Sequence, residues 1–190
     1  MDNTFKSKLS QLILDSNPLA VIVIDQNREF VDCNEAALKL FKTEAKEHLL
    51  ENHFLYSAPI QPNGMFAGEL ARTHVDAVTE SGEHTASWVY KDKNGELIPC
   101  EIILKKIEYN EEYIIIKYIR DLREEIKTQA EVREITERNK IMIDVTTTCF
   151  VFFDDEFNIV DCNPAALSLF GIKTIKTYTM SFPLMGTVYA

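Results

Sequence analysis

The sequence predicts an α+β fold: an antiparallel sheet with helices on one face, then a long connecting helix and a partial second copy of the same unit. Residues 31–41 recur 129 positions later at 160–170 with nine of eleven residues unchanged, which marks a duplicated domain. Asn94-Gly95 separates two runs of strand-forming residues, as in a hairpin. Beyond Asp121, apolar residues recur at helical spacing without Gly or Pro until the repeat begins.

The first part of the chain predicts a short helix and a hairpin. Apolar residues at helical spacing end at Asp15, and two apolar runs, 19–25 and 29–33, flank a polar turn. Asn34 precedes an Ala-rich segment, where its side-chain oxygen is placed to accept a bond from a first-turn amide. We therefore expect Asn34 to cap a helix, and loss of the cap to cost about 1 kcal/mol.

The middle of the domain predicts a short helix near 43–52, a loop and a long helix. Residues 53–64 contain two prolines and a glycine, which favours an irregular loop that packs through Phe54, Leu55 and Tyr56 and forms a candidate lid. Residues 65–81 show helical periodicity and end at Gly82, a typical C-terminal helix signal.

Three strands are predicted at 85–92, 96–106 and 113–120, with a primed turn at Asn94-Gly95. Alternation places Trp88 and Tyr90 together on one face of their strand, and the next strand turns an apolar set inward. In the third strand we assign Ile116 and Tyr118 to the inner face, opposite the charged Lys117. The inner set of the second strand comprises Ile98, Cys100, Ile102 and Leu104.

These elements give four segments: a leading helix at 1–18, a domain at 19–121, a connecting helix at 122–147 and a partial second unit at 148–190. Asp121 and Glu124 have the spacing of a capping box at the start of the connecting helix. The second copy lacks the three-stranded part of the first. We therefore expect a truncated unit whose residues 149–170 are exposed, paired in a dimer or poorly ordered.

Composition limits the function classes. Apolar residues make up 46% and charged residues 26% of the chain, as in globular domains. The net charge of −10, with dispersed bases, argues against a nucleic-acid partner. The four cysteines lack metal-site spacing, and no catalytic constellation or membrane-spanning run is present in the sequence, which predicts a cytoplasmic protein that is not an enzyme and has no metal site.

Several motifs carry a family resemblance. Asn34-Glu35-Ala36-Ala37 resembles the N-x-A-A run of PAS domains, 91–95 resembles their K-D-G hairpin, and Arg120-Asp121-Leu122 resembles the junction from which their signalling helix starts. The order of elements over residues 7–145 is similar to the PAS fold. Residues 61–64 and Trp88 resemble landmarks of bacterial sensors that string such domains in tandem.

The resemblance implies a cytoplasmic sensory module. Such a module binds a small ligand or a partner and passes the signal through a helix, with Asp121 and Leu122 as the junction. It also implies a histidine kinase or diguanylate cyclase output domain in a longer parent, since neither output signature is found in the sequence. The apolar stripe of the connecting helix favours a homodimer, because dimerisation would cover it. The alternatives are a ligand-free dimerisation module and a fragment of a cofactor-dependent enzyme.

The expected ligand pocket lies between the inner sheet face, the helices and the loop. A plain hydrophobic core is the competing interpretation, because aromatic residues commonly fill cores. His53 and His74 are the histidines placed to ligate a haem iron, although Arg72 and Asp76 suggest a solvated face for His74. The cofactor, if there is one, is not identified by the sequence. The pocket candidates are Phe54, Tyr56, His74, Trp88, Tyr90, Cys100, Ile102, Ile116 and Tyr118.

Overall fold

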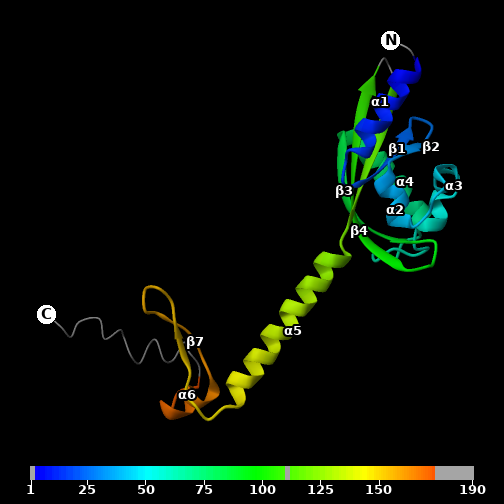
Figure 1. The fold of residues 1–190 in the computed structure, drawn as a ribbon. Coiled ribbons are helices and arrows are strands. Elements are labelled where there is room, and N and C mark those ends of the chain that lie inside the picture. The colour runs from blue at the N-terminus through cyan, green and yellow to red at the C-terminus, as the bar shows by residue number, and fades with distance from the viewer. Residues whose placement is uncertain (1–2, 110–111, 174–190) are drawn as a thin grey trace. The chain divides into compact units, whose positions relative to one another are not determined.

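The computed structural model describes residues 3–109 and 112–173, which form two units that meet between Ile126 and Lys127. The first unit is built on a five-stranded antiparallel sheet with strand order β2-β1-β5-β4-β3 (Figure 1). Its strands are β1 (Ala20–Asp25), β2 (Phe30–Cys33), β3 (Glu83–Lys91), β4 (Leu97–Tyr109) and β5 (Glu112–Asp121). The predicted α+β fold with an antiparallel sheet is confirmed.

The helices of the first unit follow one another along the chain in the predicted order. They are α1 (Asn3–Asp15), α2 (Glu35–Phe41), α3 (Lys46–Glu51) and α4 (Ala67–Ser81). A 3-10 helix, η1 (His53–Tyr56), occupies the start of the predicted loop. The loop packs through Tyr56, which is buried, whereas Phe54 and Leu55 are exposed, so that part of the packing prediction is wrong.

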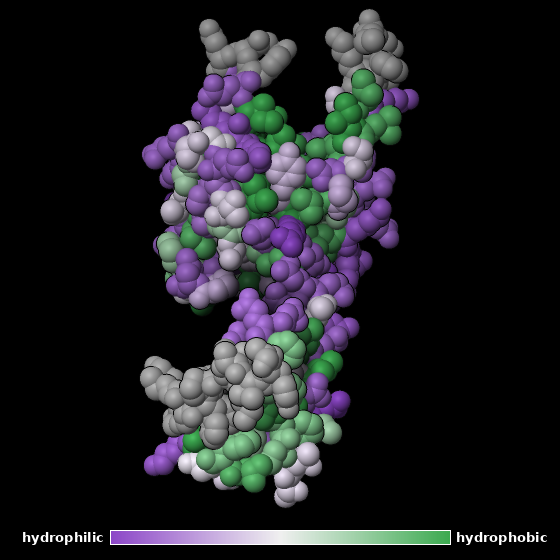
Figure 2. Space-filling view, turned by 90° about the vertical axis from the view of Figure 1, so that its left-hand side faces the viewer, coloured by the Kyte–Doolittle hydropathy of each residue, from purple (hydrophilic) through white to green (hydrophobic). Residues whose placement is uncertain are grey.

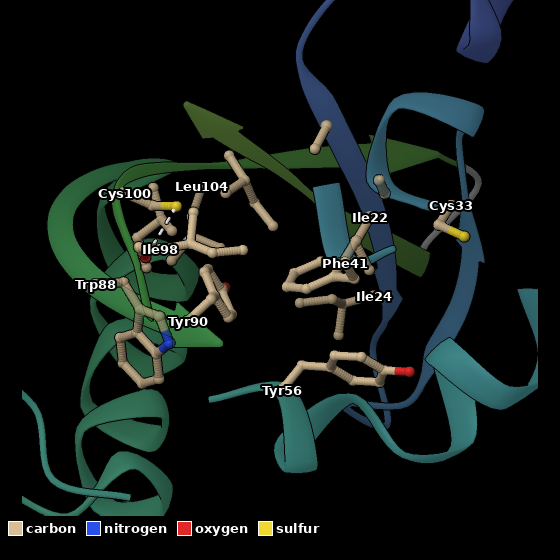
Figure 3. Packing of buried hydrophobic residues seen from close by; sticks show 14 of the residues in the cluster. Ile22, Ile24, Cys33, Phe41, Tyr56, Trp88, Tyr90, Ile98, Cys100 and Leu104 are labelled. Atoms are coloured by element: carbon tan, nitrogen blue, oxygen red, sulfur yellow. Dashed lines mark hydrogen bonds between the residues drawn. The ribbon is translucent and has the colours of Figure 1, made fainter. Parts of the chain in front are cut away.

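The core lies between the sheet and the helices α2 to α4. Phe41 of α2 packs against Tyr56 and Tyr90, with ring centroids 5.2 Å apart in both pairs. Figure 3 shows Ile22 and Ile24 beside these rings, and Trp88 next to Tyr90 on β3. Aromatic rings of this size bury large apolar areas, so this cluster supplies much of the hydrophobic stabilisation of the first unit.

The side chain of Asn34 does more than cap α2. Its Oδ1 accepts from the backbone N–H of Ala37, as a cap does, and also from the N–H of Val21 in β1, both at 2.9 Å. Its Nδ2 donates to the carbonyl of Leu19 at 2.8 Å and to that of Leu14, at the end of α1, at 3.3 Å. Asn34 therefore joins α1, β1 and α2 from a fully buried position.

The second unit repeats this arrangement. Its described elements are the two-stranded sheet β6 (Val151–Phe153) and β7 (Ile159–Cys162) and the helix α6 (Pro164–Leu169). Asn163 Oδ1 accepts from Phe150 and Ala166, and Nδ2 donates to the carbonyl of Ile143 in α5 (Arg123–Val145). The end of α5 thus relates to the second unit as the end of α1 relates to the first.

The same turn closes three hairpins. The Oδ1 atom of Asp92 accepts from the N–H groups of Asn94 and Glu96, and Gly95 has a φ of +84°. Asp25 and Asp154 make the corresponding pairs of bonds in their own hairpins. The hairpin at 92–96 is confirmed, but the primed turn is wrong. Asn94 does not have a positive φ, because the aspartate side chain stabilises a longer turn with only one left-handed residue.

The face assignment of β5 is also wrong. Ile102 and Leu104 of β4 lie opposite Ile119 and Lys117, and directly opposed residues share a face. Lys117 is therefore turned inward, only 7% exposed, while Ile116 and Tyr118 lie on the outer face and are half-buried. The charge of Lys117 suggested the opposite face, because alternation alone does not show that a lysine has partners inside.

The second unit exposes apolar side chains on its surface. Figure 2 shows mixed hydrophilic and apolar side chains over the first unit and a green apolar cluster in the second. The exposed apolar residues of the second unit include Phe152, Phe153 and Leu169. Exposure is one of the three outcomes expected for 149–170, although Asn163 and Ala166 within it are buried. The end of the predicted partial unit, 174–190, lies outside the described residues.

Candidate ligand-binding site

A cavity of about 400 Å³ lies between the inner sheet face, α4 and η1 of the first unit. This volume falls within the range of about 300–1,000 Å³ that is usual for small-molecule sites. Its walls are mainly apolar and come from every layer of the domain: Ile24, Phe30, Val75, Trp88, Ile102 and Leu104 line it.

Lys117 lines this cavity from β5. Its Nζ lies 2.9 Å from Nε2 of His53 and 3.3 Å from the hydroxyl of Tyr90. The Nζ also lies 5.1 Å from the centre of the Phe30 ring. All these partners are neutral, and the described residues place no carboxylate in an ion pair with the amine.

Burial governs the protonation of this cluster. It lowers the pKa of Lys117 from 10.5 to about 7. Burial, and then the nearby Lys117 charge, hold the pKa of His53 well below 6.5, and burial raises the pKa of the Tyr90 hydroxyl. Near neutral pH the amine of Lys117 is therefore the group that changes its charge, while the imidazole and the phenol are neutral.

A second polar pair lies on the α4 side of the cavity. His74 Nδ1 is 2.8 Å from Nε2 of His84 on β3, and His74 Nε2 is buried without a hydrogen-bond partner. Burial, and then His84 and Lys117, lower the pKa of His74. The solvated face expected for His74 is wrong, because the ring is half-buried beside Trp88, although Arg72 and Asp76 are exposed.

Hydrogen bonds connect the loop after η1 to the edge strand β3. The Gln61 side chain accepts from the N–H of Val89 at 2.8 Å and donates to the carbonyls of Val89 and Ala58. Trp88 Nε1 donates to Ser57 Oγ at 3.3 Å. These bonds cover part of the edge of β3 and hold the loop beside the cavity.

The predicted pocket residues divide into three groups. Five line the cavity: Phe54, His74, Trp88, Tyr90 and Ile102. Tyr56 and Cys100 are buried in the core, where Cys100 donates from Sγ to the carbonyl of Ile98 (Figure 3). Ile116 and Tyr118 lie on the other face of the sheet and do not reach the cavity. Sequence reasoning missed Lys117, and an unpaired basic residue within an apolar strand was the available signal.

The predicted junction lies where β5 meets α5. Asp121 is the last residue of β5, and its Oδ1 accepts from the N–H of Arg123 at 2.9 Å. Leu122 donates its backbone N–H to the carbonyl of Pro99 on β4, also at 2.9 Å. Arg123 pairs with Asp121 at 2.6 Å and with Glu96 at 3.2 Å. The start of α5 is therefore bonded both to the end of β5 and to the residue that precedes β4.

Within 3–109 and 112–173, no group of three or more His, Cys, Asp or Glu side chains is arranged to hold a metal ion. The helices of the described part of the chain include none that is long and apolar enough to cross a membrane.

Two features define the class of this fold. The strands have the order β2-β1-β5-β4-β3, and helices enclose a cavity on one face of the sheet. A PAS domain model matches residues 18–124, and a second PAS domain model matches residues 144–187. The chain belongs to the PAS domain family. No curated protein sequence matches it at a significant level.

Solved structures show the same fold at low sequence identity. A PAS domain of an HTR-like protein from Haloarcula marismortui is 15% identical, with a TM-score of 0.51, and the match covers 62% of this chain and 93% of that one. An RNA-binding light-oxygen-voltage receptor is 16% identical, with a TM-score of 0.51, over 73% of this chain and 39% of that one. A PAS domain from a two-component sensor histidine kinase is 15% identical, with a TM-score of 0.47, over 63% and 99%.

Proposed function

We propose that the first unit is a sensory domain that binds a small, mostly apolar molecule in its cavity and transmits the binding to α5. One observation carries this proposal: β5 holds both Lys117, at the cavity, and Asp121, at the start of α5. A ligand that has different affinities for two arrangements of β5 changes their populations, and α5 then follows the strand.

The bonds at the junction support transmission. Because Leu122 is bonded to Pro99 and Arg123 to Glu96, a shift of β5 against β4 changes the direction in which α5 leaves the sheet. The ligand therefore acts on the helix through two rigid strands.

The experiment combines native mass spectrometry of the purified chain, before and after incubation with a library of small aromatic molecules, with hydrogen exchange. We expect a bound molecule to change amide exchange at 119–126. Ala71→Phe, which fills the cavity, should abolish both effects, because Ala71 lines it. Thr73→Phe is the matched control, since Thr73 is exposed on the same helix. Binding that survives Ala71→Phe would contradict the proposal.

We further propose that the domain works in the cytoplasm, has no catalytic activity of its own and regulates a kinase or diguanylate cyclase domain of a longer signalling protein. The two consecutive PAS matches support this proposal, since tandem sensory units serve as inputs. Expressing the full reading frame of the parent gene and assaying its kinase and cyclase activities would test it.

A second candidate function is a ligand-free dimerisation module. The observation that favours it is the apolar surface of α5, where Val132, Ile135 and Met142 are all more than half exposed and no residue of the helix is buried. Pairing with a second chain would cover this surface. Light scattering should give a dimer mass that Ile135→Glu reduces and the exposed control Lys140→Glu does not. A monomer at high protein concentration would contradict this function.

A further inference from the structure

The charged residues that line the cavity all have the same sign. They are Arg28, Arg72 and Lys117, and the lining contains no Asp or Glu. The whole chain has 30 acidic and 20 basic side chains, a net charge of −10. The cavity therefore differs in charge from the rest of the protein, and an anionic ligand would account for this difference.

The three cations have different positions. Arg28 and Arg72 are exposed, and the guanidinium of Arg28 is paired with Asp76 at 2.7 Å. Lys117 is buried, and its hydrogen-bond partners are the neutral groups of His53 and Tyr90. A buried amine without an anion costs stability. A ligand carboxylate at this point would supply the missing counter-charge.

We propose that the cavity selects small monocarboxylic acids with an apolar, aromatic or aliphatic body. The carboxylate lies at Lys117 Nζ, and the body lies along Val75, Trp88 and Ile102. This inference rests on the proposed function, since it names the class of ligand. A phosphate or a dicarboxylate fits less well, because Lys117 is the one buried cation of the lining and the other walls are mainly apolar.

The surroundings of Lys117 set the pH dependence of binding. The titratable groups that face it are His53 from η1, Tyr90 from β3 and His74 from α4. The pKa values of both histidines are lowered from 6.5 and that of Tyr90 is raised, so all three stay neutral from pH 7 to 8.5. Above pH 7 the acid must bind together with a proton on Lys117, so its affinity should fall by up to about tenfold per pH unit.

The test uses phenylacetate and its neutral isostere phenylacetamide in calorimetric titrations at pH 7.0 and pH 8.5. At pH 7.0 the wild-type chain should bind the acid at least about tenfold more tightly than the amide. Lys117→Met should lose this preference and still bind the amide. Lys105→Met is the matched control, because Lys105 is exposed on the neighbouring strand. Far-UV circular dichroism confirms that each variant is folded.

The outcomes separate the inference from the proposed function. Equal binding of acid and amide by the wild-type chain would overturn the carboxylate selectivity and leave the cavity as a ligand site. Acid selectivity that persists in Lys117→Met, or that does not weaken between pH 7.0 and 8.5, would also overturn the inference. Binding of neither probe would overturn it together with the role of the cavity as a site for small aromatic molecules.

Discussion

Lys117 Nζ lies 2.9 Å from Nε2 of His53, although 64 residues separate them. The contact joins the central strand β5 to the 3-10 helix η1 at the wall of the cavity. A lysine in this position costs stability, because burial opposes its charged form. Such a cost is typical of functional groups rather than of packing.

Lys117 should make stability depend on pH. Its pKa is about 7 in the folded state and 10.5 in the unfolded state, so between these values the unfolded chain binds more protons and stability rises with pH. The full slope is about 1.4 kcal/mol per pH unit. We expect urea unfolding at pH 7.5 and 8.5 to show a gain of about 1 kcal/mol, which Lys117→Met removes and Lys105→Met retains.

The pH window of this measurement matters. The pKa of Cys33 is raised to about 11 and that of Cys100 to about 12, both by burial, so above pH 9 these thiols make stability fall. An identical gain in the wild-type chain and in Lys117→Met would show that Lys117 is not the group responsible.

Replacing Asn34 should lower the free energy of unfolding by more than the loss of a helix cap does. Asn34→Ala removes the side-chain bonds to the N–H groups of Val21 and Ala37 and to the carbonyl of Leu19. The Ala37 N–H keeps the Asn34 backbone carbonyl at 3.1 Å, whereas the buried groups of Val21 and Leu19 lose this partner, at about 1–3 kcal/mol each. We expect a loss of about 3 kcal/mol, against the cap value of about 1 kcal/mol. The probe is the fluorescence of Trp88, the single tryptophan of the chain, during urea unfolding.

Asn163→Ala is the matched control for Asn34→Ala. It removes the corresponding bonds in the second unit, so the Trp88 transition should shift by less than about 0.5 kcal/mol. A loss of only about 1 kcal/mol in Asn34→Ala would show that the link to β1 contributes nothing.

Substitutions at two glycines distinguish the effect of backbone strain on stability from that of packing. Gly82 ends α4 with a φ of +83°, and Gly68 lies within the first turn of the same helix; an added Cβ meets no atom within 4 Å at either position. Gly82→Ala should cost about 1 kcal/mol, because alanine disfavours a positive φ. Gly68→Ala should stabilise by up to about 1 kcal/mol, because it favours the helix. Thermal unfolding of both variants checks this, and equal effects would contradict the explanation.

Local signals in the sequence predicted much of the fold. Asn34 before an Ala-rich helix, Gly82 after a helical pattern and Asn94-Gly95 between strands each act within a few residues, where side-chain hydrogen bonds and φ preferences decide the backbone. The turn type at Asn94-Gly95 was missed, because it depends on the carboxylate of Asp92.

The candidate site was predicted only in part. Trp88 and Ile102 line the cavity as the alternation of their strands indicated, but Ile116 and Tyr118 do not. The error arose from residues 113–119 of β5, which are apolar on both faces except for Lys117, so a single charge determined the assignment.

The sequence by itself determined the duplicated domain, the order of the elements and the helix caps at Asn34 and Asn163, because these follow from local patterns along the chain. The bonds that link Asn34 to β1 and to α1 span 13 to 20 residues, and the tertiary structure revealed them. Only the tertiary structure decided that Lys117 faces inward and that it meets His53 and Tyr90. The physical reason is that the burial of a charge depends on partners brought from distant strands and helices, and a pattern that alternates along one strand carries no information about them.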